Sequence, residues 1–232
     1  MDLLLLHGAI GSSEQLLPLA NKLKENFKVY TLDFTGHGAS ENTSDAFSIE
    51  LFANDVVDWM SLNKITSINI FGYSMGGYVA LYLAIQHPTK VKRVFTLATK
   101  FNWTPEIAQG QIKLLNPEKI LEKLPAYAKI LEHRHQLFNW KNVLEKTSAM
   151  MVDLGKNAPL NTYSLRSLNC PVLVAVGDND KMVSVDETEQ ACKDMPNAKF
   201  LIIPKTTHHI EEVDILTLSS LLNNFFNATN NN

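Results

Sequence analysis

The chain is poor in cysteine and in net charge. It has 232 residues, two cysteines (Cys170 and Cys192) and a formal net charge of −3. Two cysteines cannot build the disulfide framework of a small secreted domain, and they are typical of reduced thiols in a cytoplasmic protein. So small a net charge gives no reason to expect nucleic acid or an anionic membrane as a partner.

Long apolar runs are also lacking. The N-terminal stretch MDLLLLHG has four consecutive leucines, and it carries an acid where a secretory signal needs basic residues. A membrane-spanning helix needs about 20 apolar residues, so we expect neither a signal peptide nor a membrane span. With 45% hydrophobic and 19% charged residues, the composition is that of a globular protein and excludes disorder of the whole chain.

The most informative stretch runs from Ile65 to His87. An apolar, β-branched run leads directly into Gly72-Tyr73-Ser74-Met75-Gly76, and a helix-compatible segment follows. Strand, G-x-S-x-G and helix in this order are typical of a nucleophile elbow. Such a tight turn strains the serine backbone and needs small neighbours. It presents the Ser74 hydroxyl, with the Met75 amide at the helix N-terminus. The alternative is a glycine-rich turn with an incidental serine, and the flanking elements favour the elbow.

Strands alternate with helices along most of the chain, which predicts a parallel sheet covered on both faces. The expected strands are 3–6, 28–32, 65–71, 93–99, 171–176 and 199–203. Residues expected to cap helices are Ser12, Ser48, Ser184 and Asp214. A further helical stripe consists of Ile120, Leu124, Tyr127 and Leu131.

Five motifs, in this order, resemble the α/β-hydrolase family. They are HGAIGS at 7–12, DFTGHGAS at 33–40, GYSMGG at 72–77, GDNDKMV at 177–183 and PKTTHH at 204–209. The resemblance implies a mostly parallel sheet of about six strands flanked by helices. Its core would comprise 1–99 and 168–232, with a short helical cap inserted at 100–167. Family members usually begin with two further strands that are missing here, which would leave the strand at 28–32 at a sheet edge.

The resemblance also implies a catalytic triad in the chain order serine, acid, histidine, with Ser74 as the nucleophile. Asp180 occupies the acid position of the family's G-x-x-D-x-x-V loop, and Asp178 is the rival, closer to the strand end. The other acid position of the family follows the preceding strand. No Asp or Glu occurs at 93–105, which favours Asp180.

Two adjacent histidines compete for the role of the base. His208 aligns best, and His209 stays open because Thr207 replaces the family's glycine and a one-residue slip in a loop costs little. A histidine pair also suggests a metal site. No further Cys or His stands at ligand spacing, so we expect no metal and no cofactor.

Backbone amides of Ala9 and Met75 are implied as the oxyanion hole. His7 and His37 are expected to brace their loops by hydrogen bonds rather than to act on substrate. The candidates for substrate contact are the aromatic residues Tyr73, Phe101, Trp103, Phe138 and Trp140. Their alternative role is packing of the cap onto the core.

Together these features predict a cofactor-independent serine hydrolase that cleaves a small ester, thioester or similar carbonyl substrate through an acyl-enzyme. Hydrolysis of a carbon–carbon bond by the same triad is the alternative within enzymes. A dehalogenase is disfavoured, because its nucleophile is an aspartate where this chain has Ser74. Outside enzymes, the alternative is a ligand receptor built on the same fold.

Overall fold

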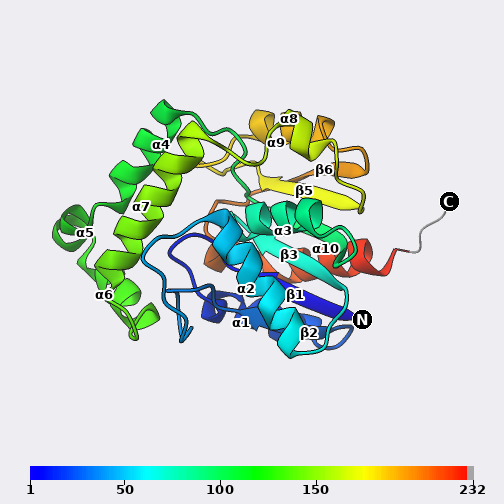
Figure 1. Cartoon of the computed structure of the whole chain (residues 1–232), viewed down its shortest axis with the longest axis horizontal. Coiled ribbons are helices and arrows are strands. Elements are labelled where there is room, and N and C mark those ends of the chain that lie inside the picture. The colour runs from blue at the N-terminus through cyan, green and yellow to red at the C-terminus, as the bar shows by residue number, and fades with distance from the viewer. Residues whose placement is uncertain (229–232) are drawn as a thin grey trace.

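In a computed structural model, which describes residues 1–228, six strands form one sheet. The strands are β1 (Asp2–Leu6), β2 (Lys28–Leu32), β3 (Ile68–Tyr73), β4 (Val91–Leu97), β5 (Val172–Gly177) and β6 (Ala198–Ile203). Their order is β2-β1-β3-β4-β5-β6, and every pair is parallel (Figure 1). The predicted fold class is confirmed, with a sheet that is wholly rather than mostly parallel.

The positions of β1 and β2 in the sheet explain the sequence patterns of the two strands. Leu3 to Leu6 are fully buried, because β1 lies between β2 and β3 and has helices on both faces. β2 lies at the sheet edge, as expected. Lys28 begins this edge strand and is exposed, and its ammonium group lies 5.2 Å from the centroid of the Tyr30 ring. A charged edge of this kind discourages pairing with another chain.

Helices cover both faces of the sheet (Figure 1). On one face, α1 (Leu17–Leu23) and α10 (Ile215–Asn227) bury their apolar stripes with Leu3 and Leu5. On the other, α2 (Ile49–Leu62), α3 (Met75–Gln86) and α9 (Val185–Lys193) pack with Leu4 and Leu6. The two hydrophobic clusters use alternate residues of β1, as expected for a strand whose side chains point in turn to the two faces.

Three of the predicted caps are confirmed by hydrogen bonds to backbone amides. The pairs are Ser48 with Leu51, Ser184 with Glu187, and Asp214 with Thr217. Ser12 precedes a 3₁₀ turn, η1 (Ser13–Leu16), and its backbone amide donates to the Gln15 side chain at 3.0 Å. α1 itself begins at Leu17, with Pro18 in its first turn.

A helical segment lies on the side of the sheet where the strands end (Figure 1). It comprises α4 (Pro105–Ile112), η2 (Lys113–Leu115), α5 (Pro117–Lys123), α6 (Pro125–Arg134) and α7 (Trp140–Lys156). The chain then returns to the core, where the short α8 (Thr162–Leu165) lies beside α9. The stripe predicted as one helix is divided at Leu124, which is 56% exposed, whereas Ile120 and Leu131 are buried. The prediction was wrong there because a residue before proline disfavours the helical conformation, and Pro125 begins a new helix.

The strand order determines where a ligand can bind. β1 pairs with β2 on one side and with β3 on the other, so the loops that leave β1 and β3 diverge at this point of the sheet. In open α/β sheets, ligands bind at such a switch point, outside the carboxyl ends of the strands. The loop after β1 begins at His7, and the turn after β3 contains Ser74.

None of the helices in residues 1–228 combines the length and the hydropathy that a membrane span requires.

Candidate active site

Ser74 has the strained backbone that the elbow requires. Its φ is 52° and its ψ is −117°, a conformation that a residue with a side chain rarely adopts. Its amide donates to the Leu97 carbonyl at 2.8 Å, and the Thr99 hydroxyl donates to the Ser74 carbonyl at 3.0 Å. A side chain at Gly76 would collide with the Leu6 carbonyl oxygen, so the turn needs glycine there. These hydrogen bonds and the close packing at Gly76 hold the strained turn in place.

Two backbone amides lie beside this turn. Met75 is the first residue of α3, where an amide has no acceptor within the helix and the helix dipole favours negative charge. Gly8 passes so close to the elbow that an added Cβ would lie 2.9 Å from the Tyr73 ring and 3.2 Å from the Ser74 Cβ. Within residues 1–228, the amide of the next residue, Ala9, donates no hydrogen bond. Both amides are therefore available to an oxyanion formed at Ser74.

The structure brings Asp180 and His208 together from the loops after β5 and β6. Nδ1 of His208 donates to Oδ2 of Asp180 at 2.8 Å, which leaves Nε2 as the basic nitrogen. The His208 ring lies against Tyr73, with 5.7 Å between ring centroids, and is 8% exposed. Among the described residues, the Ser74 hydroxyl makes no hydrogen bond to His208. Such contacts often tighten only when substrate is bound.

His209 is placed differently from its neighbour. It is exposed and precedes the short turn η3 (Ile210–Glu212). Its ring meets that of His208 edge-on at 6.2 Å. Of the two histidines, the structure therefore joins His208 to a carboxylate and directs His209 outward.

The other oxygen of Asp180 is held by its own loop. Oδ1 accepts from the amides of Met182 and Val183, at 2.8 and 2.9 Å. Burial raises the pKa of Asp180, but the hydrogen bond and charge of His208 and the two amides outweigh burial and lower the pKa overall. The carboxylate is thus ionised at neutral pH. Its contribution to folding stability is present there and is lost as the pH falls through the lowered pKa.

Asp178, the rival candidate for the acid, has a structural role in the loop. Its Oδ1 accepts from the Thr206 amide at 3.3 Å, and its own amide donates to the Ile203 carbonyl at 3.2 Å. These contacts connect the loops after β5 and β6, and they leave Asp178 without a bond to either histidine.

Replacing Asp180 with asparagine is expected to lower kcat by roughly 10⁴-fold, because the amide favours the wrong histidine tautomer. Asp178→Asn is the matched control and should lose far less activity. Steady-state hydrolysis of a chromogenic ester by the two purified variants measures both effects. The reverse ranking would transfer the acid role to Asp178.

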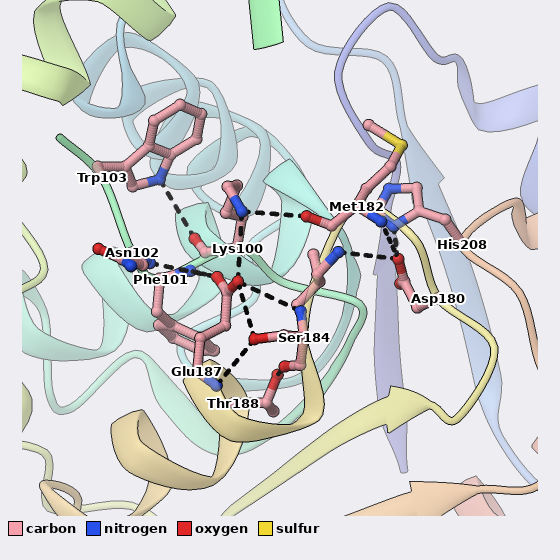
Figure 2. A network of polar contacts seen from close by, with 11 residues as sticks. Lys100, Phe101, Asn102, Trp103, Asp180, Met182, Ser184, Glu187, Thr188 and His208 are labelled. Carbon is pink, nitrogen blue, oxygen red and sulfur yellow. Dashed lines mark hydrogen bonds and ion pairs between the residues drawn. The ribbon is translucent and has the colours of Figure 1, made fainter. Parts of the chain in front are cut away.

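A second carboxylate supports the acid loop (Figure 2). Oε1 of Glu187 accepts from the amides of Phe101 and Asn102, at 3.1 and 3.3 Å. The Lys100 ammonium donates to Oε2 of Glu187 at 3.3 Å and to the Met182 carbonyl at 3.0 Å. Glu187 also pairs with Ser184 in the cap of α9. Its contacts tie the start of the helical segment to the loop that holds Asp180.

His7 and His37 brace loops, as predicted. Nδ1 of His7 donates to the Gly8 carbonyl at 2.8 Å, and its Nε2 accepts from the Phe34 amide at 3.2 Å. Burial lowers the pKa of His7 to about 3, so the ring is neutral. Nδ1 of His37 donates to the Thr35 carbonyl at 3.1 Å. No cluster of three or more His, Cys, Asp and Glu side chains suited to a metal ion occurs in residues 1–228.

The five aromatic candidates divide into two groups. Tyr73 and Trp140 are 6% and 8% exposed. Tyr73 packs between Gly8 and His208, and Trp140 packs inside the helical segment, so packing accounts for both. The partly exposed aromatics, which pack against the main core, are Phe101, Trp103 and Phe138. Phe138 also lines a cavity of about 70 Å³ between Phe47 and α7, and Ser74, Asp180 and His208 are not among its lining residues.

The chain is similar in sequence to α/β-hydrolase fold proteins. A family model described as alpha/beta hydrolase fold matches residues 3–117. A probable alcohol acetyltransferase of Cyberlindnera jadinii is 26% identical over 165 residues, which cover 70% of this chain and 44% of that protein. The chain therefore spans less than half the length of this relative.

Two solved structures share the fold over most of their length. A thermophilic esterase from Thermogutta terrifontis superposes with a TM-score of 0.77 at 21% identity, covering 97% of this chain and 89% of the esterase. An enol-lactonase from Burkholderia xenovorans gives a TM-score of 0.76 at 19% identity, with 98% and 91% covered. At these identities the likeness concerns the fold alone.

Proposed function

Because the chain belongs to the α/β-hydrolase fold family, we propose that it is a serine hydrolase that cleaves a small ester, thioester or similar carbonyl substrate. The observation that supports this most strongly is the 2.8 Å bond from His208 to Asp180, together with the strained turn that presents Ser74. A serine hydroxyl becomes a nucleophile only when a positioned base takes its proton.

In the proposed first step, Oγ of Ser74 attacks the substrate carbonyl while Nε2 of His208 accepts the hydroxyl proton. Asp180 stabilises the imidazolium that forms. The negative charge that develops on the carbonyl oxygen is met by the amides of Ala9 and Met75. Collapse of this intermediate breaks the bond to the leaving group, which takes the proton from His208, and leaves an ester on Ser74.

In the proposed second step, water attacks the acyl group on Ser74 and gives its proton to His208. The tetrahedral intermediate then expels Ser74, which recovers the proton, and the carboxylic acid is released. An alcohol in place of water would give a new ester by the same chemistry. The similarity to an alcohol acetyltransferase supports this transfer as a second candidate activity.

A fluorophosphonate probe and a series of p-nitrophenyl esters of increasing acyl length test the proposal. We expect the probe to attach to Ser74, as located by peptide mass spectrometry, and at least one ester to be hydrolysed. Addition of ethanol tests transfer, because an acetyltransferase would release ethyl acetate in proportion to p-nitrophenol. A labelled Ser74 without turnover of any ester would favour the carbon–carbon hydrolase, to be assayed with a β-diketone. An unlabelled, folded protein would favour a receptor.

A further inference from the structure

The loop that carries the Ala9 amide contains an unfavourable residue. Gly8 to Gly11 form a tight turn, closed by a bond of 3.1 Å from the Gly11 amide to the Gly8 carbonyl. Its third residue, Ile10, has a φ of 52°. Glycine or asparagine is preferred at such a position, and a β-branched residue there is an outlier. Something outside the turn must therefore hold Ile10 in this conformation.

Two side chains from the end of α6 bind the carbonyl oxygen of Ile10. Nη1 of Arg134 donates to it at 3.2 Å, and Nε2 of His135 donates at 3.0 Å. We call these two bonds the Ile10 clamp. They occupy both lone pairs of the oxygen, and the two donors lie more than 120 residues away along the chain. The Ile10 side chain also packs against both the main core and the cluster within the helical segment.

His135 is well defined as a donor. Its ring is fully buried, and its Nδ1 accepts from the Gly38 amide at 3.1 Å. A neutral imidazole with an acceptor at Nδ1 carries its proton on Nε2, which is the atom that faces Ile10. Burial lowers the pKa of His135 to about 4, so this neutral form persists at neutral pH.

Arg134 connects the clamp to the loop of the base. Its Nη2 lies 3.2 Å from Oε1 of Glu211, three residues after His208. The same carboxylate oxygen accepts from the side chain of Gln15, whose Oε1 binds the Ser12 amide. One end of α6 therefore contacts both the turn after β1 and the loop after β6.

We infer that Arg134 and His135 are positioning residues, which hold the Ile10 carbonyl and so keep the Ala9 amide aimed at the oxyanion. The inference deepens the proposed function and rests on it. Neither residue has a role in proton transfer. Their effect is to preorganise a donor whose benefit is greatest in the transition state, and a small displacement of such a donor is costly.

Two substitutions at His135 separate its two hydrogen bonds. In asparagine, the amide oxygen stands two bonds from Cβ, as Nδ1 does in histidine, so His135→Asn keeps the acceptor for Gly38 and loses the donor to Ile10. In glutamine, the amide nitrogen stands three bonds from Cβ, as Nε2 does, so His135→Gln keeps the donor. His133→Asn is the control, because His133 is exposed on the same helix.

We expect His135→Asn to lower kcat by roughly 10- to 100-fold with KM little changed, because the clamp acts on the transition state. His135→Gln should recover most of that loss, and His133→Asn should behave as wild type. Arg134→Gln should lower kcat in the same direction, and it replaces His135→Asn if that variant does not fold. An active protein whose kcat is unchanged in His135→Asn, or in Arg134→Gln as its replacement, would overturn the positioning role.

A second measurement is independent of catalysis. Hydrogen exchange of the peptide containing 7–12 reports the Gly11 amide that closes the turn, and we expect faster exchange in His135→Asn than in wild type or His135→Gln. Unchanged exchange would refute the clamp even if no substrate is found. Conversely, a wild-type protein that hydrolyses no ester but shows the exchange difference would refute the proposed function and leave the clamp intact.

Discussion

Ser74→Ala is expected to lower kcat for ester hydrolysis by about 10⁴-fold or more, because the members of a triad act as a unit and nothing replaces the attacking oxygen. The fold should be unaffected. Alanine and serine both carry a Cβ, so the substitution leaves the strain at a φ of 52° unchanged. The hydrogen bonds that hold the turn are made by the Ser74 backbone amide and carbonyl, which alanine keeps.

The measurement combines turnover, fluorophosphonate labelling and thermal melting. Ser61→Ala is a matched control, because this hydroxyl lies on α2 and only donates to the Val57 carbonyl at 2.8 Å. It should retain wild-type activity and labelling. Substantial turnover by a folded Ser74→Ala protein would mean that another residue is the nucleophile.

His208→Ala is expected to cost as much as loss of the nucleophile, on the order of 10⁴-fold or more in kcat. The variant removes the base and leaves Asp180 without its partner at 2.8 Å. His209→Ala should keep most of the activity, because that side chain is exposed and has no bond to a carboxylate. If His209→Ala is the inactive variant, the assignment of the base is wrong.

The pH dependence gives an independent test of the same assignment. A protonated imidazole cannot accept the serine proton, so kcat/KM should rise with pH until the base is neutral. The lowered pKa of Asp180 keeps its carboxylate charged over this range, so the rising limb reports the histidine. The limb should survive in His209→Ala and be absent from the residual hydrolysis by His208→Ala.

Much of the fold could be predicted because it depends on local patterns. The uninterrupted apolar run at Leu3 to Leu6 predicted a strand buried on both faces, and it is one. Capping residues located the starts of α2, α9 and α10. The stripe through Leu124 predicted one helix where the structure has two. Periodicity depends only on side-chain spacing and does not include the effect of Pro125 on the residue before it.

The sequence by itself determined the positions of the strands along the chain, the elbow around Ser74 and the loops in which an acid and a base were to be sought. Local spacing and chain order are sufficient for these features. Only the tertiary structure decided that Asp180 rather than Asp178 contacts His208, because neighbouring side chains in a loop point in different directions. It alone also joined the end of α6 to the Ile10 carbonyl, since contacts between segments so distant in sequence leave no periodic pattern in either.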